Sequence, residues 1–400
     1  MGTNFLAYAA PSTADIGIYT YASVYQFARG IAVSRSQSAF VAFDDEHVVI
    51  YIRESGGAWT FSQAITEPLV NLYPSNSYSS PMYTVNNWLA ISDSSDTIAV
   101  GVPWSASYQY GRVDIYQRSG GTWSLQQVVE PTTPELYSEF GMSVSLSSDG
   151  NTLAVGAPQH DAGSAGSNRG RVFFFTRSGS TWSQYGFVGM PSPVTNGWFG
   201  TAAALSADGS LCAITANRSG ESLWMAQLSG GTWSVVSTYT PATSATVTVI
   251  GGQVDVALSN DASTVLLSLG GSTVKNNSGI SQSNAGAAYL LSYASSTFTK
   301  VAEFYADTPV SQGGMGSAVA MTGDGQFAAL RGEDRTYASP YPSIWKSWKQ
   351  TSPGTWTAQK TVIGSQSDPA FEGFAAFAMY GQNRVINTEV WGGFKVETAD

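Results

Sequence analysis

Two histidines are the first candidates for chemistry in this sequence. His47 follows the acidic run at 44–46, and His160 is followed by Asp161. An imidazole beside a carboxylate can act as a general base or as a metal ligand. Successive residues of a strand point to opposite faces, so the acids beside His47 would be spread apart rather than converge on a metal. A hydrolytic role for His160 would need a nucleophile and an orienting partner, and no motif in the sequence identifies them. We therefore expect no catalytic residue, no metal site and no cofactor.

The composition narrows the class of protein further. Charged residues make up only 12% of the 400 residues, and the formal net charge is −10. A chain with few cations is poorly suited to a phosphate backbone, so we expect no nucleic-acid partner. No apolar stretch reaches the ~18 residues of a membrane span, and the start of the chain lacks the basic and apolar regions of an ordinary secretory signal. The one cysteine, Cys212, lies in an apolar strand and is expected to fill core space.

A four-strand pattern recurs along the chain and would position any functional residue. It is clearest from Glu139 to Gln184, where two strands joined by the turn "SSDGN" precede a loop, the strand "GRVFFFTR", a Gly-rich turn and a strand that contains Trp182. The same turn and aromatic anchor recur, at Trp59, Trp123, Trp182, Trp233, Phe298 and Trp356. A repeat of roughly sixty residues that holds one four-stranded antiparallel unit is typical of a β-propeller blade. Separate domains of this length could not each bury a core.

The sequence therefore predicts an all-β fold, a single seven-bladed β-propeller domain over residues 1–400 with four-stranded antiparallel blades. The predicted blades span residues 28–67, 86–130, 139–190, 198–241, 250–306, 313–364 and 372–400, the last together with 2–10. The C-terminal segment supplies only three strands. We expect the N-terminal stretch "GTNFLAY", Gly2 to Tyr8, to add the fourth and close the ring, which removes two free sheet edges.

Several of these stretches resemble a known family. Phe140–Gly141, Gly156–Ala157–Pro158 and the strand "GRVFFF" resemble FG-GAP repeats, the blades of the integrin-α-type seven-bladed propeller, and the third unit matches the motif best. In calcium-binding members of the family the first turn of a blade resembles D-x-D-x-D-G, which gathers several carboxylates around one cation. The turns here carry one acid each, namely Asp149, Asp208, Asp261 and Asp324. A single carboxylate is typical of a turn-forming residue, so we expect no calcium in these turns.

The predicted propeller has two different faces. The connections between the first and second and between the third and fourth strands are short, whereas the others are long and differ from blade to blade. Variable loops on a constant scaffold usually carry binding, and rigid aromatic residues among Ser, Asn and Gly are typical of recognition surfaces. The predicted ligand-binding residues are Trp104, Tyr108, Tyr110, Tyr73, Tyr78, Asp161, Arg169, Tyr337 and Tyr341. For any one of these tyrosines, filling a gap between blades is an equal alternative.

These features favour a non-enzymatic recognition or adhesion protein that binds a cell-surface glycan or protein through its loops. A chain without an ordinary signal, few lysines and a polar, aromatic surface suits an extracellular or virion-surface protein, a receptor-binding or structural component with other particle proteins as partners. One alternative is a glycan-active hydrolase or lyase on the same scaffold, for which the loop acids to inspect are Asp161, Glu333 and Asp334. Another is a purely architectural ring in a larger assembly.

Overall fold

The fold consists of small antiparallel sheets. The computed structural model describes residues 18–20, 30–34, 36, 38–43, 47–53, 59–66, 88–103, 110–163, 167–216, 223–249, 255–333, 335, 343–363, 377–380, 384–389 and 393–398. Within these ranges the chain forms seven four-stranded sheets and one three-stranded sheet. In the same residues, no helix is long and apolar enough to cross a membrane.

The four-stranded sheets follow one another along the chain, and we number them 1 to 7. Sheet 1 contains β2 (Gly30–Val33), β3 (Ala39–Phe43), β4 (His47–Arg53) and β5 (Trp59–Thr66); sheet 2 contains β6 (Leu89–Ile91), β7 (Thr97–Val102), β8 (Arg112–Ser119) and β9 (Thr122–Val129). Sheet 3 contains β10 (Ser143–Leu146), β11 (Thr152–Ala157), β12 (Arg171–Ser178) and β13 (Thr181–Gly189); sheet 4 contains β14 (Phe199–Leu205), β15 (Leu211–Ala216), β16 (Leu223–Ser229) and β17 (Thr232–Tyr239).

The remaining sheets keep the same order with two additions. Sheet 5 contains β19 (Val256–Leu258), β20 (Thr264–Leu269), β23 (Ala287–Ala294) and β24 (Thr297–Phe304); sheet 6 contains β25 (Ala318–Met321), β26 (Phe327–Glu333), β27 (Ser343–Ser352) and β28 (Thr355–Ile363). Sheet 7 contains β29 (Phe377–Tyr380), β30 (Arg384–Glu389) and β31 (Gly393–Thr398), with β1 (Ile18–Thr20) beside β31. The three-stranded sheet, which we call the projecting sheet, contains β18 (Val247–Thr248), β21 (Thr273–Lys275) and β22 (Ser281–Gln282).

Sheet 3 shows how the sequence pattern becomes structure. The strands β11 and β12 are apolar at successive positions and are buried on both faces, whereas β13 alternates, with Trp182 buried and Tyr185 exposed. Inner strands covered on both sides need continuous apolar residues, while an outer strand needs them on one side only. A bulge between Phe174 and Phe175 shifts the register against β13. Corresponding bulges occur in sheets 2, 4 and 5, and a bulge sharpens the twist of a sheet.

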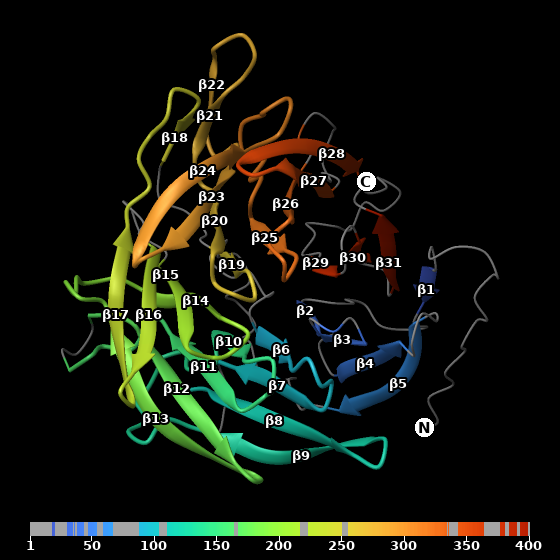
Figure 1. The fold of residues 1–400 in the computed structure, drawn as a ribbon, viewed down its shortest axis with the longest axis vertical. Coiled ribbons are helices and arrows are strands. Elements are labelled where there is room, and N and C mark those ends of the chain that lie inside the picture. Colours follow the sequence, from blue (N-terminus) through green and yellow to red (C-terminus); the bar gives the residue numbers. More distant parts are fainter. Residues whose placement is uncertain are drawn as a thin grey trace.

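Neighbouring sheets contact one another through their first strands. Contacts run from β2 to β6, β10, β14, β19, β25 and β29 in turn, and β29 also contacts β2. Figure 1 shows these first strands near the centre of the molecule and the fourth strands on the outside. The hydrophobic residues between the sheets form the core, which includes the buried Cys212, as expected from its apolar strand.

The aromatic anchors of the repeat pack between neighbouring sheets. Trp123 of sheet 2 is 2% exposed and lies in one cluster with Val41 and Ile50 of sheet 1. Its backbone N–H and C=O bond the side-chain amide of Gln63, also in sheet 1, at 2.8 and 3.0 Å. Trp233 of sheet 4 stacks on Phe174 of sheet 3, with ring centroids 3.7 Å apart. The recurring Trp is therefore an architectural residue.

The Phe–Gly pair at the start of a unit forms a second link between sheets. The backbone of Phe140 bridges to Gly111 of the preceding sheet, and that of Phe199 bridges to Gly170. Gly170 has φ of +80°, and a Cβ there would lie 2.1 Å from the Phe199 oxygen. Only glycine has both the backbone freedom and the small size for this approach. The Phe–Gly motif is thus explained by packing.

The first turns of successive sheets are joined by backbone hydrogen bonds. Asp93 N–H donates to Ser148, Ser148 to Ala207, Ala207 to Asn260, and Asn260 to Gly323, over 2.7 to 3.0 Å. Each donor and acceptor occupies the second position of its turn, after Ser92, Ser147, Ser206, Ser259 and Thr322. This chain of bonds holds the turns together on one face, which we call the tight-turn face.

The two ends of the described chain meet in sheet 7. The strand β1 pairs with β31 in antiparallel register, with Ile18 opposite Lys395 and Thr20 opposite Gly393. An N-terminal strand therefore lies beside the C-terminal one, but it comes from further along the chain than the stretch predicted from the sequence. The predicted stretch, Gly2 to Tyr8, lies outside the described residues.

The sequence analysis missed the projecting sheet, because β21 and β22 lie within one of the long connections that it expected between strands. β21 and β22 form a hairpin there, and β18 pairs with β21. The hairpin turn is organised by Asn276, whose Oδ1 accepts the N–H groups of Ser278 and Ile280 at 3.0 and 2.9 Å. The strands are too short and too polar to show a periodic pattern in the sequence. Figure 1 shows this hairpin extending beyond the other sheets.

Candidate functional site

The connections between sheets and the loops between second and third strands lie opposite the tight turns, and we call this side the loop-rich face. Its described parts include residues 130–142, 158–163, 167–170, 190–198, 270–286 and 305–317. Of the predicted ligand-binding residues, Tyr110, Asp161 and Arg169 are described. The other candidates lie outside the described residues, namely Trp104, Tyr108, Tyr73, Tyr78, Tyr337 and Tyr341, and so does Asp334.

Tyr110 and Arg169 occupy equivalent places in sheets 2 and 3. Each precedes the glycine that contacts the next Phe–Gly pair, and each is half-buried. The Tyr110 carbonyl accepts the Phe140 N–H at 3.0 Å and the Ser138 hydroxyl at 3.0 Å. The Arg169 carbonyl accepts the Phe199 N–H at 3.2 Å. In the described structure these contacts are made by backbone atoms and serve the link between sheets.

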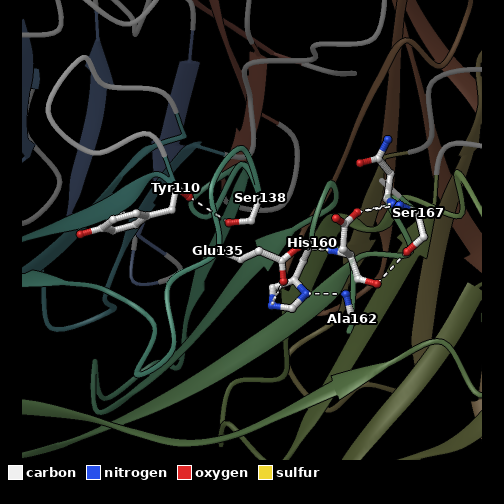
Figure 2. Close-up of polar contacts among 8 residues, drawn as sticks. Tyr110, Glu135, Ser138, His160, Ala162 and Ser167 are labelled. Carbon is white, nitrogen blue, oxygen red and sulfur yellow. Dashed lines mark hydrogen bonds and ion pairs between the residues drawn. The ribbon is translucent and has the colours of Figure 1, made fainter. Parts of the chain in front are cut away.

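His160 is locked into the loop of sheet 3, as Figure 2 shows. Its side chain is 6% exposed. The Ala162 N–H donates to His160 Nδ1 at 2.8 Å, and His160 Nε2 lies 3.2 Å from Glu135 Oε2. Since Nδ1 accepts a hydrogen bond, the proton of the neutral ring belongs on Nε2, where it is donated to Glu135. Both ring nitrogens are therefore engaged.

Asp161 organises the same loop. Its Oδ1 accepts the N–H groups of Ser167 and Asn168 at 2.7 and 2.9 Å, and its carbonyl accepts the Ser167 hydroxyl at 2.7 Å. The Asp161 N–H in turn donates to Glu135 Oε1 at 2.5 Å. The loop 158–170 and the connection 130–142 are thus fastened together by Glu135, His160 and Asp161.

The electrostatics of His160 favour the neutral ring. Burial, together with the positive charge of Arg171, lowers the pKa of His160 to about 4, although Asp161 opposes the shift. A base with so low a pKa is a weak proton acceptor near neutral pH. Its geometry and its pKa both make His160 a structural residue of the loop.

The exposed residues Leu136 and Tyr137 lie on the connection 130–142. The bonds among Glu135, His160 and Asp161, which we call the lock, hold this connection in place. Leu136 is 59% exposed and Tyr137 is 64% exposed. Tyr137 has φ of +63°, a conformation that bulky residues adopt rarely. The same position before the Phe–Gly pair is occupied by Asn196 in sheet 4, with φ of +54°. Asn tolerates this backbone well and Tyr does not, so a tyrosine here is unexpected on structural grounds alone.

The sequence analysis missed this pair. Leu136 and Tyr137 precede the Phe–Gly motif in "ELYSEFG", where sheet 4 has "VTNGWFG". Aligning the two segments places Tyr137 against Asn196. This difference between equivalent positions was the signal in the sequence that could have pointed to Tyr137. Exposure could not be predicted, because a lone apolar pair between strands is as consistent with core packing.

On the tight-turn face the turn acids are committed to their own turns. Asp208 Oδ1 accepts the Ser206 hydroxyl at 2.6 Å and the Ser210 N–H at 3.0 Å. Asp149, Asp261 and Asp324 make the corresponding bonds. Burial raises the pKa of Asp208, but these hydrogen bonds outweigh it and lower the pKa overall. Among the described residues, no group of three or more His, Cys, Asp or Glu is placed to hold a metal ion.

Comparison with known proteins supports the repeat and the fold. Residues 123–175 match the FG-GAP repeat family. The chain is similar in structure to a chain of hydrazine synthase from Kuenenia stuttgartiensis, with a TM-score of 0.58 and 8% identity over 98% of this chain and 99% of that one. It is also similar to a chain in the crystal structure of a mitotic checkpoint complex, with a TM-score of 0.56 and 12% identity over 100% of this chain and 99% of that one.

These similarities establish a β-propeller fold with FG-GAP repeat character. At such low identity they carry information on the fold alone. No curated protein matches the sequence significantly.

Proposed function

We propose that this protein is a non-enzymatic recognition propeller, a single domain whose seven blades close into a ring and whose loop-rich face binds a cell-surface protein or glycan. The seven sheets are the proposed blades. The contact of β29 with β2 and the pairing of β1 with β31 support closure. The FG-GAP repeat supports an interaction scaffold, and an extracellular location suits such repeats. The particle-surface role expected from the sequence remains part of this proposal.

The observation that carries the proposal is the exposed Leu136–Tyr137 pair on a fixed backbone. Exposed apolar residues on a rigid support bind at low entropic cost, since little order has to be imposed on binding. Strained backbone conformations persist where function keeps them. The lock by Glu135, His160 and Asp161 supplies the rigidity.

The described acids favour recognition over catalysis. Asp161 Oδ1 already accepts two backbone N–H groups, and Glu333 Oε2 lies 2.7 Å from Arg335 in an ion pair. A glycosidase needs one carboxylic acid and one carboxylate on either side of the scissile bond. The arrangement of these two acids does not favour that chemistry.

The test is binding of the labelled full chain to a glycan array and to intact cells. Tyr137→Asn introduces the residue found at the equivalent position of sheet 4. We expect it to weaken binding about tenfold, as for an interface hot spot, and to raise the free energy of unfolding by about 1 kcal/mol through relief of strain. Trp104→Ala and Tyr341→Ala test the loop residues predicted from the sequence.

The matched control is Tyr185→Asn. Tyr185 is 45% exposed but lies on the outer strand β13, away from the loop-rich face. The Tyr185→Asn variant should bind its partner as strongly as the wild-type chain does. Equal loss of binding in both tyrosine variants, or unchanged binding in Tyr137→Asn, would contradict the assignment of this pair.

A further inference from the structure

At one position of the third strand, the chemical type of the side chain differs among sheets 2 to 6. In sheets 2 to 6 it lies opposite Val100, Val155, Ile214, Leu267 and Leu330, and it is occupied by Asp114, Phe173, Trp224, Tyr289 and Lys346 respectively. All five side chains belong to buried residues. The aromatic members fill the space beneath the connection from the preceding sheet: Phe173 packs on Phe140, and the Tyr289 hydroxyl donates to the Ala242 carbonyl at 2.9 Å.

In sheet 6 this space is a cavity. It has a volume of about 340 Å³ and lies between the connection that follows β24 and the strands β26 to β28. Its walls include Met315, Ile344, Val310, Thr308, Glu333 and Lys346. A lysine side chain is thinner than the aromatic rings at the equivalent positions, which accounts for the open volume. The pocket opens among residues of the loop-rich face.

Lys346 is a buried cation with a weak counter-charge. The residue is 4% exposed. Its described partners are Asp307, whose carboxylate bonds its Nζ, and the ring of Trp348, whose centroid lies 5.1 Å from Nζ. The Asp307 side chain is itself 74% exposed. A buried charge needs close partners to offset its desolvation, and a carboxylate in water is screened and can swing away.

Asp114 in sheet 2 shows what a fully compensated charge looks like at this position. Its carboxylate is held by Arg112 through three hydrogen bonds of 2.9 to 3.0 Å, and both side chains are mostly buried. The ammonium of Lys346 has three protons to donate, and one described carboxylate, at the mouth of the pocket, accepts from it.

From this geometry we infer that the pocket binds an acidic sugar unit, with the sugar carboxylate on Lys346 in place of Asp307. The apolar walls from Met315 and Ile344 suit the C–H face of a sugar ring, and the hydroxyls of Thr308 and Thr361 can bond its hydroxyl groups. The volume admits one small ligand rather than a peptide segment. This inference rests on the proposed function, because it names a glycan unit as one ligand of the loop-rich face.

The experiment is titration calorimetry of the full chain with D-galacturonate, D-glucuronate and N-acetylneuraminate, with D-galactose as the neutral control. We expect at least one acidic sugar to bind and galactose to bind about tenfold more weakly, since hydrogen bonds to charged groups are the strong ones. Lys346→Met should remove the preference for the acid. Asp307→Asn should strengthen binding severalfold, because it removes the competing carboxylate.

Lys346→Tyr is the second variant, since tyrosine fills the equivalent space in sheet 5. It should be at least as stable as the wild-type chain and should not bind the sugar. No binding of any acidic sugar, equal binding of galactose, or unchanged binding in Lys346→Met would overturn the inference. Cell binding that depends on Tyr137 but not on Lys346 would leave the proposed function standing while this pocket assignment fails.

Discussion

The tight-turn face and the loop-rich face of this protein are built differently. On the tight-turn face, the first turns of sheets 3 to 6 repeat the same bonds: the Asp carboxylate accepts the Ser or Thr hydroxyl and the N–H two residues on, as in Ser206, Asp208 and Ser210. The turns are then joined by one backbone bond each. On the loop-rich face, the described connections differ from one another: one carries the contact of Glu135 with His160, another forms the projecting hairpin, and a third covers the Lys346 pocket.

The difference separates residues that repeat because the architecture needs them from residues that depart from the repeat, on which the proposed function rests. Repeated residues, such as the Trp anchors and the turn Asp residues, are explained by contacts within and between sheets. The informative residues are the departures at equivalent positions, such as Tyr137 where sheet 4 has Asn196, and Lys346 where sheet 5 has Tyr289. Both lie toward the loop-rich face.

The largest expected effect is a loss of stability, and it should differ between two glycine variants. Gly170→Ala and Gly179→Ala both place a side chain at positive φ, at +80° and +61°. Only Gly170 faces a backbone oxygen, that of Phe199, whereas a Cβ at Gly179 meets nothing within 4 Å. Chemical denaturation should show losses of more than about 3 kcal/mol for Gly170→Ala and about 1 kcal/mol for Gly179→Ala. Equal losses would mean that the link between sheets 3 and 4 yields easily.

A smaller effect concerns the pH dependence of the His160 lock. Because the folded-state pKa of His160 is lowered to about 4, the unfolded chain takes up this proton first as the pH falls below about 6.5. The stability from the neutral ring is therefore present above about pH 6.5 and is lost as the pH falls through the folded-state pKa.

Between about pH 7 and about pH 5, wild type should lose about 2 kcal/mol more than His160→Gln. The measurement is the free energy of unfolding of both proteins at the two pH values. The turn acids do not interfere with this measurement. The pKa values of Asp149, Asp208 and Asp261 are lowered from 3.8, so these carboxyl groups titrate below the pH range used. Parallel curves for the two proteins would show that His160 is not held neutral.

The sequence predicted the repeat well because its signals are local and recur. The Trp anchors, the Asp-containing turns and the strand that contains "GRVFFF" each report a contact that recurs among the described sheets. The sequence analysis missed features that occur in a single copy. It did not predict β1, which pairs with β31, and the short polar strands of the projecting sheet carry no periodicity. The cavity at Lys346 follows from a difference in side-chain volume between sheets, which can be seen only after the register is known.

Prediction of the candidate site was limited in the same way, because the role of each candidate residue depends on its own surroundings. Choosing aromatic loop residues selected Tyr110, whose described bonds come from its backbone carbonyl, and passed over Tyr137, whose side chain is exposed. Asp161 proved to be a loop-organising acid. Residue type alone could not distinguish these roles, because they are set by backbone conformation and burial.

The most direct test of the account adds one arginine to each face. Leu136→Arg alters the loop-rich face, and Thr181→Arg alters an exposed position at the start of β13 on the tight-turn face. Both proteins should fold with wild-type stability, and binding to the same cells or glycans should be measured by surface plasmon resonance. We expect Leu136→Arg to weaken binding about tenfold or more and Thr181→Arg to leave it unchanged. Loss of binding in Thr181→Arg with normal binding in Leu136→Arg would contradict the central claim and place the contact surface on the tight-turn face.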